Sequence, residues 1–399
     1  MKISLYIERI AKRSGGAERV VVNVANQLSM HGYDVEIVCY EDTEGEIFYK
    51  LDSKVVYRNL KVVAANSATS MEKIAKRLTS WASRYDRMPL LNRVAWSLKN
   101  RPKIKRLSAY FEDNPTDLII SFLPPTFVVT SFVAAKLGIQ YILSLHNVPR
   151  EDFENPKRWD QNIKNKKLMF KALENSSANT VILEEFKEYF SSKIKPHTFM
   201  VRNFICKPEV NPPPILSRPK RIIAVGRYAA PKDHKTLIKA WANIHADHPG
   251  WSVSIYGDGP LKNELGKIIK EHQLGGSICL HGPTKNINSE YANSQIFCIP
   301  SLFEGFGLVT VEAMSLGLPC VGFASCPGTN RIIDDDHGRL VDCDDLNKAE
   351  ALAEQLKILI LDSSLRDQLS AKAIKNAEDY FVENRISDWL KIIKNVTHE

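Results

Sequence analysis

Residues 299–323, IPSLFEGFGLVTVEAMSLGLPCVGF, constrain the fold more than any other part of the sequence. The segment opens as a short apolar strand and breaks at a glycine-containing loop, residues 303–307. It resumes as a helix in which Leu308, Val311, Met314 and Leu316 are spaced for one buried face. Open α/β sheets bind ligands where the C-terminal loop of a strand leads into a helix. The sequence therefore predicts an α/β fold with a ligand site at this turn.

The same turn has the composition of a phosphate site with carboxylates beside it. Gly305 and Gly307 allow backbone N–H groups to approach an anion, and a helix N-terminus adds a positive field. Glu304 and Glu312 have seven residues between them, and their negative charges would repel a phosphate. They fit such a site if they bind sugar hydroxyls, because one carboxylate can accept hydrogen bonds from two adjacent hydroxyl groups. On spacing alone, a solvated loop glutamate and a helix-surface glutamate are the commoner case. Within a glycine-rich strand-to-helix turn, a sugar-phosphate site is favoured.

This segment resembles the E-x7-E signature of the retaining glycosyltransferases of family 4, which have the GT-B fold of two facing Rossmann-like α/β domains. The match runs over Pro300-Ser301, Glu304-Gly305-Phe306-Gly307-Leu308, Glu312-Ala313-Met314, Gly317 and Pro319. The resemblance implies that Glu304 contacts the transferred sugar and Glu312 the nucleotide ribose. It implies that the backbone of Gly305, Phe306, Gly307 and Leu308 binds the donor diphosphate. Val309-Thr310 departs from the proline or small apolar residue of many members, which bears on sugar preference.

A second pair of candidate residues follows the strand predicted at 221–225. Arg227 and Lys232 lie on one strand-to-helix loop, so a bidentate guanidinium and an ammonium could reach the same anion. As separate surface cations they would indicate nothing, but VGRxxxxK resembles the diphosphate clamp of the family. The resemblance also places Gly282, after the strand predicted at 278–281, at the border of the nucleobase. Gly257-Asp258-Gly259 lacks the third glycine of a dinucleotide fingerprint, and by resemblance it packs against the donor site.

The N-terminal residues predict a βαβ unit, with a strand at 2–10, a helix to about Met30 and a strand at 34–40. Its glycine pair, Gly15-Gly16, is not a dinucleotide motif, and a tight turn would explain it alone. The resemblance implies instead that Gly15 and Gly16 meet the acceptor, with the Gly16 backbone facing the donor diphosphate across the cleft. His146 follows the strand predicted at 141–145. A lone histidine there is more often structural, but the resemblance implies that it positions or polarises a hydroxyl near donor and acceptor.

The chain length of 399 residues favours two domains over one. Prolines 208, 212, 213, 214 and 219 mark a stiff linker between them. We expect an N-terminal acceptor-binding domain at 1–205 and a C-terminal nucleotide-sugar-binding domain at 206–380. By resemblance to GT-B proteins, a terminal helix at 381–399 crosses back to the first domain.

The positive charge lies in the N-terminal half. Residues 1–205 hold 32 Lys+Arg and 22 Asp+Glu, a net charge of +10, whereas the remainder holds 22 and 24, a net charge of −2. Residues 71–106 alone hold 11 Lys+Arg against Glu72 and Asp86, with aromatic and aliphatic residues interleaved. This basic amphipathic stretch predicts binding to an anionic membrane surface. A solvated helical hairpin that buries its aromatic residues inside the domain stays open as the alternative.

Other features set the expected compartment and chemistry. The sequence has no run of 18 apolar residues and no signal peptide at its start, and its seven cysteines form no Cys-x-x-Cys pair, so we expect a cytoplasmic protein without structural zinc. Residues 334–336 and Asp342-x-Asp344 resemble the metal-binding Asp-x-Asp of another glycosyltransferase fold. A run of three aspartates before His337-Gly338 is more often a solvated turn. No metal and no cofactor are expected.

The function expected from these observations is retaining, metal-independent transfer of a sugar from a nucleotide-sugar, most simply a UDP-sugar, to a hydroxyl of a glycan acceptor. Likeness to capsule and lipopolysaccharide transferases suggests a lipid-linked acceptor in cell-surface polysaccharide assembly, at the inner face of the cytoplasmic membrane. In the family mechanism, Arg227, Lys232 and the loop amides stabilise the leaving diphosphate, which takes the proton of the acceptor. A nucleotide-sugar epimerase of GT-B-like fold, a glucan polymerase and a basic nucleic-acid-binding protein remain as alternatives.

Overall fold

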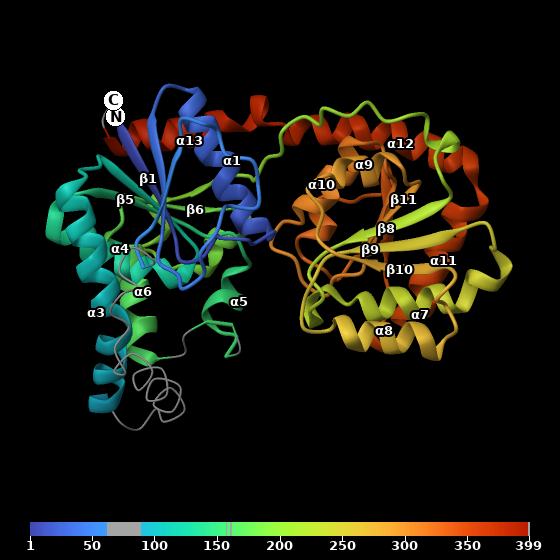
Figure 1. Cartoon of the computed structure of the whole chain (residues 1–399), viewed down its shortest axis with the longest axis horizontal. Coiled ribbons are helices and arrows are strands. Elements are labelled where there is room, and N and C mark those ends of the chain that lie inside the picture. Colours follow the sequence, from blue (N-terminus) through green and yellow to red (C-terminus); the bar gives the residue numbers. More distant parts are fainter. Residues whose placement is uncertain (62–88, 157, 160–161, 398–399) are drawn as a thin grey trace. The chain divides into compact units, whose positions relative to one another are not determined.

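The computed structural model of the chain describes residues 1–61, 89–156, 158–159 and 162–397 (Figure 1). These residues divide into two compact units. Unit 1 comprises Met1–Arg202 together with Ile386–Glu399, and unit 2 comprises Asn203–Arg385. The boundaries lie close to those expected at 205 and 380, and the C-terminal helix belongs to unit 1 from Ile386 onward.

Unit 1 is built on a parallel sheet with the strand order β3-β2-β1-β4-β5-β6-β7. Its strands are β1 (Lys2–Ile7), β2 (Asp34–Cys39), β3 (Val56–Asn59), β4 (Leu118–Phe122), β5 (Gln140–Ser144), β6 (Ala178–Val181) and β7 (Thr198–Met200). The central strands β1 and β4 are almost wholly buried, as expected for a parallel sheet covered by helices on both faces. From β1 the chain builds β2 and β3 on one side, and it then crosses from β3 to β4 on the other side of β1. This reversal creates a switch point between the carboxyl ends of β1 and β4.

The helices of unit 1 are α1 (Gly16–Met30), α3 (Pro89–Asp113), α4 (Pro124–Leu137), α5 (Pro149–Phe153), α6 (Ile163–Asn175) and α13 (Val382–Thr397). Helices α3, α4 and α6 pack on one another (Figure 1). The ring of Trp389 in α13 lies 6.1 Å from that of Phe122 in β4. Helix α6 is capped at its N-terminus by Asn162, whose side-chain oxygen accepts from the Asn165 amide at 3.2 Å.

Unit 2 is built on a second parallel sheet with the order β10-β9-β8-β11-β12-β13. Its strands are β8 (Arg221–Val225), β9 (Ser252–Tyr256), β10 (Ile278–His281), β11 (Ile296–Ile299), β12 (Cys320–Phe323) and β13 (Gly338–Val341). Here β8 lies between β9 and β11, so the switch point is at the carboxyl ends of β8 and β11.

The helices of unit 2 are α7 (His234–Ile244), α8 (Lys262–Glu271), α9 (Ile287–Ala292), α10 (Leu308–Ser315), α11 (Lys348–Leu361) and α12 (Ser363–Ala377). Helices α7, α8 and α11 cover one face of the sheet, and α9, α10 and α12 cover the other (Figure 1). The expectation of a single buried face for α10 is wrong. Thr310, Glu312 and Ser315 are buried as well, because α10 packs against β11, β12, α9 and α12.

The basic stretch predicted at 71–106 is only partly described. Residues 71–88 lie outside the described residues, and residues 89–106 form part of α3. Within α3, Trp96 is buried, as in the hairpin alternative, and the buried Lys103 pairs with Glu8. Val94 and Leu98 are exposed, as in the membrane alternative.

All seven cysteines are free thiols, and no helix in the described ranges is both long and apolar enough to cross a bilayer.

Candidate active site

The loops at the switch point of unit 2 bring together residues far apart in sequence. Arg227 and Lys232 lie on the loop after β8, and Glu304 lies on the loop after β11. The Leu302 amide donates to the Pro231 carbonyl at 2.9 Å, which joins the two loops directly. Arg227 is exposed on this edge. The carboxyl ends of the adjacent strands β8 and β11 thus carry these residues to one edge of the sheet.

Glu304 is the centre of this site. It is only 8% exposed, so the alternative of a solvated loop glutamate is wrong. Its Oε1 accepts from Ser301 Oγ at 2.7 Å and from the Nζ of Lys232, and neither bond uses Oε2. Lys232 was expected only as a phosphate ligand, and its contact with Glu304 was not predicted. The Lys232 side chain remains 27% exposed, and an ammonium has three N–H donors, so one cation can serve a carboxylate and a phosphate together.

His234 also belongs to this site and was not singled out from the sequence. It is the first residue of α7, is 3% exposed, and has its Nε2 3.2 Å from the Gly226 carbonyl oxygen. Burial, and to a smaller extent the charge of Lys232, lower its pKa to about 4, although Gly226 and Glu304 act in the opposite direction. The ring is therefore neutral at physiological pH. A signal existed, because His234 precedes Leu237, Ile238 and Trp241 at the spacing of the buried face of α7.

The N-terminus of α10 has the geometry expected for the glycine loop. Gly307 is the N-cap and has φ of +80°, a conformation that favours glycine. The rings of Phe306 and Tyr380 lie 5.6 Å apart, and Leu308 is buried, so both side chains anchor the loop within unit 2. Because their side chains are packed inside the unit, Phe306 and Leu308 could contact a ligand only through their backbone.

A second residue missed by sequence reasoning supports Glu304 from the other side. A Cβ at Gly328, in the loop after β12, would lie 2.7 Å from the Glu304 carbonyl oxygen and 3.0 Å from the Glu304 Cβ. This loop therefore packs directly on the backbone of Glu304. The Pro327-Gly328 dipeptide was the available signal, because it marks a tight turn.

The remaining predicted donor residues lie as follows. Glu312 is buried in α10, which rules out a helix-surface role. Gly282 follows β10, and among the described residues, apart from its two chain neighbours, none has an atom within 4 Å of the position of a Cβ there. The turn at Gly257 and Gly259 packs against the loop that carries Arg227, because a Cβ at Gly259 would meet the Tyr228 carbonyl oxygen at 2.5 Å.

In unit 1 the predicted glycine pair begins α1. Gly15 is the N-cap and Gly16 the first helical residue, and neither has a positive φ, so a tight turn does not explain the pair. A Cβ at Gly16 would meet nothing within 4 Å. The preceding loop is held by Glu41, whose Oε1 accepts from the amides of Ile10 at 2.6 Å and Ala11 at 2.8 Å. Glu41 was not predicted from the sequence.

His146 lies just beyond the carboxyl end of β5, as expected. It is buried, its Nε2 lies 2.9 Å from Ser144 Oγ, and its ring stacks on Phe122 with centroids 5.3 Å apart. These contacts fix the orientation of the ring.

The aspartate runs form a solvated turn, as predicted. Asp334, Asp335 and Asp336 are exposed and pair with His337, Arg339 and Lys372 respectively. Within the described parts of the chain, no three His, Cys, Asp or Glu side chains lie close enough to hold a metal ion.

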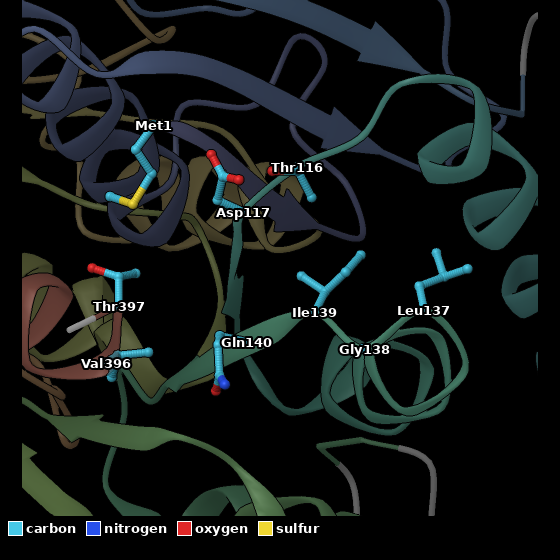
Figure 2. A pocket seen from close by; sticks show the side chains of 9 residues that line it. All are labelled: Met1, Thr116, Asp117, Leu137, Gly138, Ile139, Gln140, Val396 and Thr397. Carbon is cyan, nitrogen blue, oxygen red and sulfur yellow. The ribbon is translucent and has the colours of Figure 1, made fainter. Parts of the chain in front are cut away.

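A hollow of about 510 Å³ lies at the amino-terminal edge of the sheet of unit 1, opposite the edge that carries His146, and next to Asp117, Gln140 and Thr397 (Figure 2). It contains none of the predicted site residues.

Comparison with known proteins identifies the family of the chain. Residues 14–205 match the family model described as Glycosyltransferase Family 4, and residues 209–376 match the model described as Glycosyl transferases group 1. The chain is 26% identical, over 99% of both chains, to a Campylobacter jejuni enzyme. That enzyme is named GalNAc-alpha-(1->4)-GalNAc-alpha-(1->3)-diNAcBac-PP-undecaprenol alpha-1,4-N-acetyl-D-galactosaminyltransferase. The chain is 27% identical to an amylovoran biosynthesis glycosyltransferase of Erwinia amylovora, over 98% of this chain and 99% of the relative.

Solved structures with low sequence identity share the fold. The pneumococcal O-GlcNAc transferase GtfA, in complex with UDP and GlcNAc, has a TM-score of 0.76 at 15% identity, covering 100% of this chain and 99% of that one. Anabaena HepE, in complex with UDP and glucose, has a TM-score of 0.72 at 16% identity over 100% of both chains. The two parallel-sheet α/β units are those of the GT-B fold. The chain therefore belongs to the glycosyltransferases, with a family 4 domain in its N-terminal half and a group 1 domain in its C-terminal half.

Proposed function

We propose that this glycosyltransferase moves a sugar from a UDP-sugar to a hydroxyl of a lipid-linked glycan, with retention of configuration and without a metal ion. The observation that carries the proposal is the contact of Lys232 with Glu304 at the switch point of unit 2. A cation and a buried carboxylate side by side suit a molecule that carries phosphate and sugar hydroxyls together. The N-terminus of α10 adds amides for the phosphate.

The donor is assigned to unit 2. Lys232 and the exposed Arg227 bind the diphosphate, each charge-assisted hydrogen bond contributing about 1.5–3 kcal/mol. The backbone of residues 305–308 binds it as well, Gly282 borders the nucleobase, and Glu312 accepts from the ribose. Glu304 accepts hydrogen bonds from sugar hydroxyls at Oε2, since Lys232 and Ser301 both donate to Oε1.

The reaction follows from these assignments. The bond between the anomeric carbon and the diphosphate oxygen breaks, and the acceptor oxygen forms its bond on the same face of the sugar. The proton of the acceptor hydroxyl passes to the departing phosphate. Lys232 and Arg227 stabilise the developing charge where a metal ion would otherwise do so. Gly15, Gly16 and His146 bind the acceptor, and the fixed ring of His146 suits positioning of its hydroxyl.

The names of relatives support the substrate classes. The Campylobacter jejuni relative is named for an undecaprenol-linked glycan, and the GT-B structures of GtfA and HepE contain UDP. We therefore place the acceptor on a lipid diphosphate and the uridine nucleotide on the donor.

An anionic membrane surface at the cytoplasmic side is the proposed location. Helices α3, α4 and α6 expose Val94, Leu98, Phe132 and Ile163. Arg93 and Arg101 are exposed on α3, and Lys164 of α6 lies over the Trp96 ring at 4.4 Å. Burial lowers the pKa of Lys164, and the charges of Arg93 and Arg101 lower it further. Crowded cations beside exposed apolar side chains are the pattern of a surface that binds anionic lipid.

One incubation series tests the proposed reaction. The pure protein is incubated with UDP- and GDP-sugars, with and without undecaprenyl-diphosphate-linked N-acetylhexosamine, in buffer containing EDTA, and nucleotide release is measured. We expect acceptor-dependent release of UDP that EDTA does not reduce. Glu304→Ala and Arg227→Ala should each lower turnover at least a thousandfold while circular dichroism stays unchanged. Near-normal turnover in either variant would refute the site assignment.

Analysis of the product distinguishes the proposed reaction from the alternative functions. Proton NMR of the anomeric signal should show the same configuration in donor and product. A rearranged sugar nucleotide formed without acceptor would indicate an epimerase, and a long soluble glucan would indicate a polymerase. Tight binding to DNA with a steep salt dependence, together with no nucleotide release, would favour a nucleic-acid-binding protein.

A further inference from the structure

A buried carboxylate beyond β5 in unit 1 organises two side chains that have no assigned role. Asp152 lies on α5 and is 1% exposed. Its Oδ1 accepts from Arg158 Nε at 2.7 Å and from Trp159 Nε1 at 2.8 Å. The side-chain amide of Asn147 donates to both carboxylate oxygens, at 3.2 and 3.3 Å.

These contacts connect the cluster to a predicted acceptor residue. Asn147 directly follows His146 at the carboxyl end of β5. Asp152 therefore joins Arg158 and Trp159 to the segment that carries His146. This is the sheet edge at which α/β domains bind ligands.

The arrangement has an energetic penalty that calls for a reason. Burial raises the pKa of Asp152, although Arg158, Trp159 and Asn147 all act to lower it. Burying a carboxylate is unfavourable unless its hydrogen-bond partners compensate. What the buried charge provides here is a fixed orientation of Arg158 and Trp159.

The two oriented side chains pack on each other as a cation–aromatic pair. The Arg158 guanidinium lies over the Trp159 ring, 5.2 Å from its centroid, and both side chains are partly exposed. The electron-rich face of an indole packs favourably against the C–H groups of a sugar ring, and a guanidinium donates to its oxygens. Small-molecule sites combine aromatic surface with a few polar groups in this way.

We propose that Arg158 and Trp159 bind a sugar ring of the acceptor, and that Asp152 is the residue that positions them. This inference rests on the proposed function, since it assigns the carbohydrate of the acceptor to this surface.

Saturation-transfer NMR tests the binding directly. The probes are the methyl α-glycosides of glucose, galactose, GlcNAc and GalNAc, each with excess UDP to occupy the donor site. We expect transfer to the ring protons of at least one glycoside, reduced at least fivefold in Trp159→Leu and largely retained in Trp159→Phe. Phe199→Leu, which removes an exposed aromatic side chain from β7, is the matched control and should match the wild type. Equal transfer in wild type and Trp159→Leu, or none in the wild type, would overturn the proposal.

Kinetics separate positioning from simple stabilisation. Trp159→Leu should raise the KM for the lipid-linked acceptor about tenfold, with kcat and the donor KM within twofold of wild type. Asp152→Asn, checked for folding by its Tm, should raise the same KM, and an unchanged acceptor KM in both variants would refute the assignment. If the wild type releases no nucleotide at all, the proposed function fails, whereas glycoside binding remains measurable and decides this proposal separately.

Discussion

Gly16 is the residue at which stability and ligand binding can be separated most directly. A Cβ there would meet nothing within 4 Å, and the residue has an ordinary helical backbone at the start of α1. Gly16→Ala should therefore leave stability unchanged or raise it by about 0.4–1 kcal/mol, since alanine restricts the unfolded chain. If a ligand approaches this backbone, the added methyl group should lower kcat/KM at least tenfold. Urea unfolding and nucleotide release measure the two effects.

The control for Gly16 is Gly266→Ala in α8, where a Cβ would also meet nothing within 4 Å. This variant should gain similar stability with full activity. Full activity in Gly16→Ala would mean that no ligand comes within contact distance of that backbone.

His234 should make the stability of the protein depend on pH. Because its folded-state pKa is lowered to about 4 from an ordinary value near 6.5, the unfolded chain binds the extra proton between these values. The contribution of neutral His234 to the free energy of unfolding is therefore fully present above about pH 6.5. It is lost as the pH drops toward 4, by about 3 kcal/mol in total. His234→Gln removes this contribution, so urea midpoints measured from pH 4 to 7 should slope less than those of wild type. Parallel curves would mean that the ring protonates as easily as in the unfolded chain.

At the scale of elements, the loop after β12 should control the position of the loop after β11. A Cβ at Gly328 would lie 2.7 Å from the Glu304 carbonyl oxygen, closer than a Cβ approaches an unbonded oxygen, so Gly328→Ala must displace the Glu304 backbone or the loop that carries Gly328. We expect at least a tenfold loss of turnover and a stability cost of about 1–3 kcal/mol, the usual range for overpacking. Gly275→Ala, where a Cβ meets nothing, is the control and should lower neither quantity. Wild-type turnover in Gly328→Ala would show that the position of Glu304 tolerates such a shift.

The elements that could be predicted from sequence are those with clear ends. Strands β8 and β10 have their predicted bounds, because each is a short apolar run followed directly by a glycine, Gly226 or Gly282. Strands β3, β12 and β13 were not predicted, since no glycine follows them and each is defined by pairing with a neighbour. For such short segments, tertiary context decides the structure more than local preference does.

The candidate site divides in the same way. The shared edge of Arg227, Lys232 and Glu304 follows from strand order and could be predicted. The contact of Lys232 with Glu304, the approach of Gly328 to Glu304 and the support by Glu41 of the loop before Gly15 could not. Each depends on the reach of individual side chains between segments that are distant in sequence, which periodicity does not report.

At the scale of the whole molecule, the charge distribution gives the last prediction. The excess of 32 Lys+Arg over 22 Asp+Glu in residues 1–205, against 22 and 24 in the remainder, should draw unit 1 toward anionic lipid. We expect the protein to sediment with vesicles containing phosphatidylglycerol but not with pure phosphatidylcholine, and its binding to weaken, without being lost, as salt screens the attraction. Changing Arg93, Arg101 and Lys164 to glutamine should weaken binding by about 3 kcal/mol, roughly a hundredfold, at about 1 kcal/mol for each cation.

The matched control removes three exposed cations from unit 2, namely Lys239, Lys267 and Lys270. It changes the net charge by the same amount, so it should leave vesicle binding unchanged if the surface of α3 and α6 is what binds. Equal weakening by both triple variants would mean that net charge alone is responsible. Val94→Ser with Leu98→Ser should weaken binding even at high salt, because burial of exposed apolar side chains in the lipid interface is not screened by ions. Binding that salt abolishes fully in the wild type would therefore leave no role for these apolar residues.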